Sequence, residues 1–160
     1  MNIRLIERHD QKEVVDIMKE HPLQFPNFII KQYPIRWSSL LRSSVENNKS
    51  RFYVAYNESD TIVGHAGYIF NSEENLYEIV GVAVKINCQR QGIGKALINM
   101  ICNEVKKLNE KKIILYTLGH VGNEDTLTFY RNIGFNLINY ENDFFQKDYH
   151  RVTFTKRLAY

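Results

Sequence analysis

Hydrophobic and polar residues follow two different periods along this chain, and each period predicts one kind of secondary structure. Alternating or continuous apolar runs rich in β-branched and aromatic residues are typical of strands. Such runs predict seven strands, over residues 2–7, 51–56, 62–70, 76–86, 112–117, 135–138 and 151–158. Apolar residues spaced three and four positions apart are typical of helices. They occur over residues 11–20, 35–47, 91–109 and 123–132.

Local signals place the boundaries of several of these elements. Asp10 is suited to cap the first helix, and Gly134 is suited to end the last one. A polar turn over residues 57–60 joins two strands into a hairpin. Residues 21–34 contain all three prolines of the chain, so we expect an irregular, partly buried connection there.

The order of the elements predicts an α/β fold with a mixed sheet. The strands between residues 51 and 86 follow one another closely and are expected to form an antiparallel meander. The strand, helix and strand between residues 76 and 117 form a crossover unit, so these two strands should run parallel. No linker-like segment divides residues 1–160, which predicts a single domain with about six or seven strands and about four flanking helices.

Composition and charge disfavour several classes of protein. Hydrophobic residues make up 44% and charged residues 24% of the chain, as in globular rather than disordered proteins. Basic residues exceed acidic ones by 21 − 18 = 3, too few to indicate nucleic-acid binding. No apolar run reaches the roughly 18 residues of a membrane helix, and the first residues do not resemble a signal peptide. Cys88 and Cys102 have no metal-ligand spacing, which favours a reducing, cytoplasmic setting and no bound metal.

A loop with two glycines after the fourth predicted strand is the segment with the clearest chemistry. Gly92 and Gly94 lie between a buried-looking strand and an amphipathic helix, flanked by Arg90 and Lys95. The first N–H groups of a helix lack internal partners, and glycines let a phosphate approach them closely. The segment therefore predicts a diphosphate site. A tight turn before a solvated, lysine-rich helix face explains the same residues equally well.

Two common phosphate-binding motifs do not fit this loop. A P-loop requires Ser or Thr after its Gly-Lys pair, where this chain has Ala96. The dinucleotide-binding fingerprint requires a third glycine, where this chain has Leu97.

The loop instead resembles the pyrophosphate signature of the GNAT superfamily of acyl-CoA-dependent N-acetyltransferases. That signature is (Gln/Arg)-x-x-Gly-x-(Gly/Ala), and residues 89–94 read Gln-Arg-Gln-Gly-Ile-Gly. Residues 123–135 resemble a second family pattern, Asn-x-x-Ala-x-x-Phe-Tyr-x-x-x-Gly-Phe, with Thr126 in place of alanine. The resemblance by motif covers about residues 76–138 and implies the family's fold.

The resemblance implies that acetyl-CoA is the acyl donor. In this family the strand before the loop separates from its neighbour, often at a bulge, and its free backbone groups pair with pantetheine. The matching positions are Val82, Ala83 and Val84 for pantetheine, Gln89, Arg90, Gln91, Gly92, Ile93, Gly94 and Lys95 for the pyrophosphate, and Asn123 and Tyr130 downstream. Asn123 matches a residue that contacts pantetheine, and Tyr130 matches the acid that protonates the departing thiolate.

Acetyl transfer to an amine needs no protein nucleophile, because the amine itself attacks the thioester. Positioning, backbone donors near Val82 for the oxyanion and a base for the amine proton are the expected contributions. Glu78 is the candidate base, because some family members place a glutamate at this point of the strand. An exposed glutamate at a strand start explains Glu78 equally well, and His120 or a water relay are alternatives.

The acceptor amine stays open at this stage. Tyr33, Trp37 and the aromatic, charged stretch 144–151 either line its pocket or simply pack, and the acidic residues within 73–78 could attract a cation. An exposed last strand could support a homodimer. A non-catalytic CoA-binding domain on the same fold is the alternative function. A nucleic-acid module is disfavoured because helix 91–109 has no interleaved aromatic residues.

Overall fold

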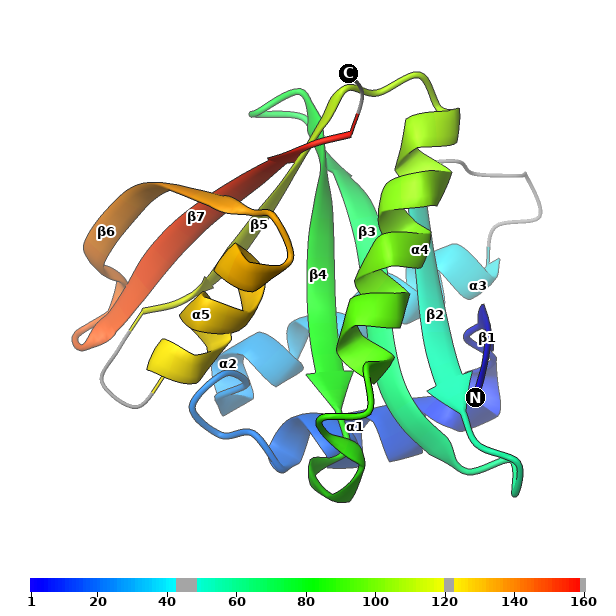
Figure 1. The fold of residues 1–160 in the computed structure, drawn as a ribbon. Coiled ribbons are helices and arrows are strands. Elements are labelled where there is room, and N and C mark those ends of the chain that lie inside the picture. Colours follow the sequence, from blue (N-terminus) through cyan, green and yellow to red (C-terminus); the bar gives the residue numbers. More distant parts are fainter. Residues whose placement is uncertain (43–48, 120–122, 159–160) are drawn as a thin grey trace.

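The computed structural model describes residues 1–42, 49–119 and 123–158, which form a mixed seven-stranded sheet with helices on both faces (Figure 1). The strand order is β1-β2-β3-β4-β5-β7-β6, and only β4 and β5 pair in parallel. The strands are β1 (Asn2–Leu5), β2 (Ser50–Tyr56), β3 (Ile62–Asn71), β4 (Leu76–Val84), β5 (Lys112–Leu118), β6 (Asn136–Gln146) and β7 (Tyr149–Arg157). The predicted mixed α/β sheet with one parallel crossover is therefore confirmed.

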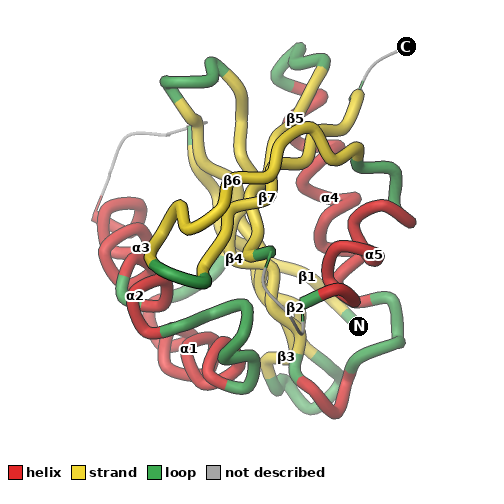
Figure 2. Tube along the Cα trace, turned by 90° about the vertical axis from the view of Figure 1, so that its left-hand side faces the viewer, coloured by secondary structure: helices red, strands yellow, loops and turns green. Residues whose placement is uncertain are grey.

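Helices cover both faces of the sheet and create two hydrophobic cores. The α-helices are α1 (Gln11–Lys19), α2 (Asn27–Ile30), α3 (Gln32–Arg42), α4 (Ile93–Lys107) and α5 (Glu124–Asn132). α4 and α5 lie on one face, where Leu97 and Ile101 of α4 are fully buried. α1, α2 and α3 lie on the other face, where Val14 and Trp37 are fully buried (Figure 2). None of the helices in the described chain is long and apolar enough to cross a membrane.

Asp10 precedes α1, but its side chain does not cap this helix as predicted. The Asp10 carboxylate accepts a hydrogen bond from the Glu7 backbone N–H at 2.7 Å and pairs with both Nη atoms of Arg4 at 2.7 and 3.0 Å. A 3-10 turn runs directly into α1, so the Asp10 backbone is already helical, with φ −78° and ψ −19°. This geometry turns the carboxylate away from the start of the helix.

Two other expectations need correction. The predicted irregular connection is wrong from Asn27 onward, where α2 and α3 lie. Pro34 is tolerated because it lies in the first turn of α3, where a missing N–H removes no helical hydrogen bond. The predicted strand 135–138 is too short, since β6 continues to Gln146 and forms a long hairpin with β7. The predicted end of the helix over 35–47 lies outside the described residues.

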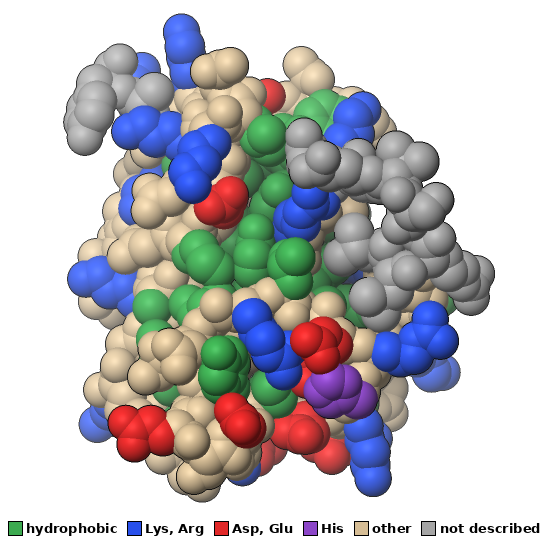
Figure 3. Space-filling view, turned by 90° about the vertical axis from the view of Figure 1, so that its right-hand side faces the viewer, with side chains coloured by type: hydrophobic (Ala, Val, Ile, Leu, Met, Phe, Trp, Pro, Cys, Tyr) green, Lys and Arg blue, Asp and Glu red, His purple; other side chains and the backbone are tan. Residues whose placement is uncertain are grey.

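The sheet ends in β1 on one side and in β6 on the other. Figure 3 shows the side that carries β1, where hydrophobic side chains form a band across the middle and acidic side chains gather mostly below it. Leu5 of β1 is 49% exposed, and β6 exposes Ile138, Tyr140 and Phe144. Both edge strands therefore expose hydrophobic side chains.

The parallel pair opens in the middle of the sheet. β4 and β5 pair only from Tyr77 and Ile113 to Ile79 and Leu115. Beyond these positions β4 continues to Val84 and β5 to Leu118, and the two strands diverge (Figure 1). Neighbouring helices and loops border the cleft that this divergence leaves between β4 and β5.

Candidate active site

The predicted anion-binding loop ends on a helix N-terminus that no described side chain caps. Residues 89–92 are exposed, and both Arg90 and Gly92 have left-handed backbone, with φ 65° and 79°. Gly92 directly precedes α4, whose first turn has no side-chain capping hydrogen bond. The first N–H groups of α4 are therefore available to an anion, and Arg90 and Lys95 are exposed beside them.

Both glycines of the loop leave room beside the helix start. A Cβ atom at Gly92 would meet no atom within 4 Å, so this side of the loop is open. A Cβ at Gly94 would lie 3.4 Å from Phe129 Cζ and 3.6 Å from Val84 Cγ2. Gly94 therefore lies where the loop, the end of β4 and α5 come together. The two sequence motifs are adjacent in space.

A bulge in β4 bends the strand at the cleft. Between the pairs His65–Ala83 and Gly67–Val80 the chain advances two residues on β3 and three on β4. The extra residue lies in the segment Gly81–Val82, and Gly81 has φ 68°. A Cβ at Gly81 would lie 2.7 Å from Tyr33 Cε1, so only glycine fits this backbone and this space.

A buried histidine, which no pattern in the sequence indicates, holds the bulge in place. His65 is fully buried, and its Nδ1 atom lies 2.7 Å from the Gly81 carbonyl oxygen. The indole N–H of Trp37 donates to His65 Nε2 at 3.2 Å. His65 therefore donates through Nδ1 and accepts through Nε2, which requires a neutral ring. Burial lowers the pKa of His65 to about 4, consistent with that neutral ring.

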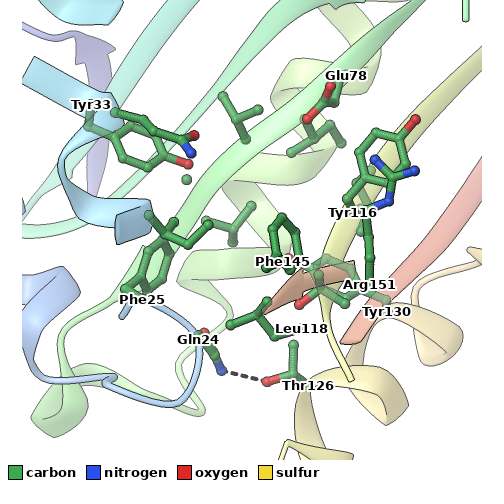
Figure 4. A pocket seen from close by; sticks show the side chains of 18 of the residues that line it. Gln24, Phe25, Tyr33, Glu78, Tyr116, Leu118, Thr126, Tyr130, Phe145 and Arg151 are labelled. Atoms are coloured by element: carbon green, nitrogen blue, oxygen red, sulfur yellow. Dashed lines mark hydrogen bonds between the residues drawn. The ribbon is translucent and has the colours of Figure 1, made fainter. Parts of the chain in front are cut away.

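A cavity of about 240 Å³ fills the cleft between the diverging strands (Figure 4). Residues 79–82 of β4 and 115–118 of β5 form its two walls. Tyr33 from α3 and Phe145 from β6 also line it. The tip of the β6–β7 hairpin reaches α2, because the ring of Phe28 lies 5.9 Å from that of Phe145 (Figure 2). The walls of this cavity thus come from segments that are far apart in the sequence.

Tyr130 lines this cavity from α5. Its side chain is 7% exposed, and its ring packs against Phe135 and Phe154 at centroid distances of 5.8 and 5.6 Å. Burial raises the pKa of Tyr130 above its usual value, so the hydroxyl is protonated at neutral pH. No described residue forms a hydrogen bond with that hydroxyl, which leaves its proton free for another group.

Glu78 lines the same cavity from β4. Its Oε1 atom accepts a hydrogen bond from Asn71 Nδ2 at 3.2 Å. Burial raises the pKa of Glu78, while the charge of Arg36, the Asn71 hydrogen bond and the charge of Arg151 oppose that rise. A carboxylate with a raised pKa is a better proton acceptor at neutral pH than an exposed one. The cavity therefore contains a potential base and a potential acid.

The remaining predicted site residues lie near the cleft with their polar groups partly engaged. Asn123 is 2% exposed, and its side-chain amide donates to the Leu118 carbonyl oxygen at the end of β5. The Val84 carbonyl oxygen lies 2.6 Å from His21 Nε2. The side chain of Ala83 is buried, whereas Val82 is half-buried and lines the cavity. His120 lies outside the described residues.

Several cavity residues had no signal in the sequence. Gln24 donates to the hydroxyl of Thr126 at 2.5 Å, which joins the segment before α2 to α5 across the cleft (Figure 4). Phe25, between α1 and α2, and Arg36, in α3, also line the cavity. Among the described residues, no three His, Cys, Asp or Glu side chains are grouped so as to hold a metal ion.

Comparison with known proteins decides the family. The sequence model of the acetyltransferase (GNAT) family matches residues 14–135. The chain belongs to the GNAT acetyltransferase family. This GNAT acetyltransferase is therefore an enzyme that takes its acyl group from acyl-CoA. A search of curated proteins found no match.

Solved structures with the same fold match nearly the whole of this chain. A GNAT-family protein from Desulfovibrio desulfuricans has a TM-score of 0.84 at 19% identity, covering 99% of each chain. An aminoglycoside 6'-N-acetyltransferase complexed with coenzyme A has a TM-score of 0.75 at 15% identity, covering 100% of this chain and 98% of that one. A spermidine N-acetyltransferase chimera from Vibrio cholerae and hSSAT has a TM-score of 0.76 at 18% identity, covering 98% and 95%. These similarities establish the fold.

Proposed function

We propose that this GNAT acetyltransferase moves an acetyl group from acetyl-CoA directly to a primary amine of a small-molecule or peptide acceptor. The observation that carries the proposal is that Glu78 and Tyr130 line one cavity where β4 and β5 separate. The open N-terminus of α4 follows β4, whose half-buried Val82 lines the same cavity. Strand β4 thus leads from the cavity that contains the acid–base pair to the proposed donor site at the start of α4.

The proposed reaction balances without a covalent enzyme intermediate. The amine nitrogen attacks the thioester carbonyl carbon, a C–N bond forms and the C–S bond breaks. Glu78 accepts the proton that the nitrogen loses, and its raised pKa favours this role. Tyr130 donates its hydroxyl proton to the departing sulfur and recovers a proton through solvent. The products are the acetylated amine and the free thiol.

On the donor side, backbone groups do most of the binding. We assign the diphosphate to residues 89–95, where the N–H groups at the start of α4 are uncapped. Pantetheine would lie along Val82–Val84, using the Val84 N–H, because the Val84 carbonyl oxygen already accepts from His21. One N–H of the Asn123 side chain donates to the Leu118 carbonyl oxygen, which leaves the side-chain oxygen and the second N–H for a pantetheine contact. The backbone near Val82 would stabilise the oxyanion.

The sequence alone left open a non-catalytic CoA-binding domain on the same fold, and the test of the proposal includes that alternative. Two measurements on the purified protein separate these functions. Calorimetry with acetyl-CoA tests donor binding, and release of free thiol with a panel of primary amines tests transfer. Thiol release that requires both acetyl-CoA and an amine, and falls in Glu78→Gln and Tyr130→Phe, supports the enzyme. Binding without thiol release for any amine supports the alternative.

Two further parts of the proposal concern context. The last strand, β7, was expected to be exposed, but it lies between β5 and β6 and is mostly buried. We therefore propose that a homodimer forms through the edge strand β6, whose Ile138, Tyr140 and Phe144 are 58%, 44% and 47% exposed. Analytical ultracentrifugation of the wild type and of Ile138→Lys tests this, and a monomeric wild type at micromolar concentration contradicts it. A cytoplasmic setting agrees with the free cysteines Cys88 and Cys102, and localisation of the tagged protein tests it.

A further inference from the structure

The charged residues that line the cavity include a single carboxylate. Among the described lining residues, the ionisable acids and bases with a formal charge at neutral pH are Arg36, Glu78 and Arg151. The other walls are aromatic, apolar or neutral polar. A polyamine or aminoglycoside presents several positive charges, and a site for such a polycation needs several carboxylates. This cavity offers one, together with two guanidinium groups.

Arg151 is already engaged by the protein. Its Nε atom lies 2.8 Å from Glu141 Oε1, and its guanidinium carbon lies 4.3 Å from the ring centroid of Tyr116 and 3.6 Å from that of Phe144. The ion pair neutralises this charge, and the two rings fix the guanidinium plane. Arg151 therefore acts as part of the wall rather than as an open cationic site.

Arg36 has no such anionic partner among the residues that the structure describes. Its guanidinium carbon lies 5.1 Å from the ring centroid of Tyr33, and no described carboxylate is within 4.0 Å of its nitrogens. The side chain is half-buried. A partly desolvated guanidinium without a carboxylate is a strong site for an anion, because its planar donors match a carboxylate with two parallel hydrogen bonds.

Arg36 and Glu78 give the cavity two poles of opposite sign. The charge of Arg36 acts on Glu78, but the two side chains form no ion pair, so each pole stays available to a ligand. The cavity volume of about 240 Å³ is small for a ligand site, which favours a compact acceptor. Phe25, Ile29 and Phe145 supply an apolar wall for the rest of such a molecule.

We propose that the acceptor is a compact zwitterion, an amine that also carries a carboxylate, as in free amino acids. Its amine lies at Glu78 and its carboxylate lies on Arg36. This inference rests on the proposed acetyl transfer and adds the class of acceptor to it. A cationic amine without the anionic group meets the charge of Arg36 with nothing to offset it, and binds less well for that reason.

The test compares matched acceptors with the wild-type enzyme, read by release of free thiol from acetyl-CoA. Each pair consists of an amino acid and the amine left after removal of its carboxylate, for example phenylalanine and phenethylamine. An aminoalkyl phosphate forms a third arm that separates carboxylate from phosphate recognition. Spermidine and kanamycin serve as polycations. We expect kcat/KM to favour the carboxylate-bearing member of a pair by about tenfold or more.

Variants of Arg36 locate the effect. Arg36→Gln is expected to raise KM for the amino acid and to reduce the preference within a pair to about one, with Arg36→Lys retaining part of it. Arg8→Gln, an exposed position outside the cavity, is the matched control and keeps the full preference. The acetyl-CoA KM should stay unchanged in both arginine-to-glutamine variants. The comparison of acceptors with the wild type stands even if an Arg36 variant does not fold.

The possible outcomes distinguish a failure of the zwitterion assignment from a failure of the proposed acetyl transfer. Equal or better transfer to the decarboxylated amine, or to spermidine or kanamycin, overturns the zwitterion assignment and leaves acetyl transfer intact. A preference for the phosphate arm over the carboxylate arm assigns Arg36 to a phosphate and also overturns it. Binding of acetyl-CoA without thiol release for any acceptor overturns both the assignment and the proposed function.

Discussion

The Nδ1 atom of His65 lies 2.7 Å from the carbonyl oxygen of Gly81, the residue at which β4 bulges beside the cleft. Trp37 donates to the opposite side of the same ring. The bulge is thus fixed by a buried chain of two hydrogen bonds that runs from α3 through β3 to β4. Since Val82 follows Gly81 directly, this chain also sets the backbone on which the thioester is expected to lie.

Acid should weaken the fold through His65. Its folded pKa of about 4 lies below the ordinary value of 6.5, so the unfolded chain binds more protons between these values and stability falls as pH falls. We expect the free energy of unfolding to lose about 2 kcal/mol from this group between about pH 7 and pH 5. His65→Leu has no titrating group at this position. The difference in the free energy of unfolding between the wild type and this variant should therefore shrink by that amount from pH 7 to pH 5. Urea unfolding of both proteins at the two pH values measures this difference, and a difference that stays constant contradicts the prediction.

Glu78 should set the acid limb of the pH–rate profile. Because burial raises its pKa, kcat/KM should fall as pH decreases at values above the usual 4.5 of a glutamate. Glu78→Gln should show no acid limb in its pH–rate profile, and its kcat should be about a hundredfold lower than that of the wild type. Asn71→Leu removes a hydrogen bond that favours the ionised carboxylate, so its limb should move to higher pH. An acid limb that is identical in all three proteins would remove Glu78 from the role of base.

Tyr130→Phe should affect turnover far more than folding or donor binding. The hydroxyl has no hydrogen-bond partner among the described residues, and phenylalanine keeps the ring contacts with Phe135 and Phe154. We expect kcat to fall by about a hundredfold, with the acetyl-CoA KM and the melting temperature close to wild type. Steady-state kinetics and a thermal melt give these values. Full turnover in the variant would leave Tyr130 as a packing residue.

Gly94→Glu should abolish tight CoA binding. The added carboxylate lies at the start of α4, beside Phe129 and Val84, where the diphosphate is expected. Gly94→Ala is the matched control, because its Cβ meets only ordinary contacts at 3.4 Å or more. Calorimetry should give a loss of at least about tenfold in CoA affinity for the glutamate and a smaller loss for the alanine. Equal affinity in the glutamate variant and the wild type would place the diphosphate elsewhere.

The sequence predicted those features whose residues lie close together along the chain. The glycines of the loop, the amphipathic spacing of α4 and the motif around Tyr130 each lie within a short segment, and the structure contains the elements that they predict. The splayed strands followed from the family resemblance, and the pairing of β4 with β5 over three positions confirms them.

Features that depend on distant contacts were not predicted. Arg36 lines the cavity because α3 packs beside the cleft, and nothing in its own segment indicates this. Phe145 and Arg151 belong to the stretch 144–151, for which the sequence left open lining a pocket or packing, and the β6–β7 hairpin brings both to the cavity. β6 is mostly exposed and polar, so its continuation to Gln146 has no hydrophobic signal and depends on pairing with β7. His65 lies in a strand of apolar residues, and its role follows from partners 28 and 16 positions away.

The proposed acetyl transfer requires that residues 89–95 bind the diphosphate of acetyl-CoA so that its thioester lies in the cleft beside Val82. A crystal structure of the wild type with CoA tests this most directly. We expect the phosphate oxygens to accept hydrogen bonds from the N–H groups at the start of α4, with the sulfur near the Tyr130 hydroxyl. Phosphates bound elsewhere, or a cleft still closed by the Gln24–Thr126 contact with CoA outside it, would contradict it.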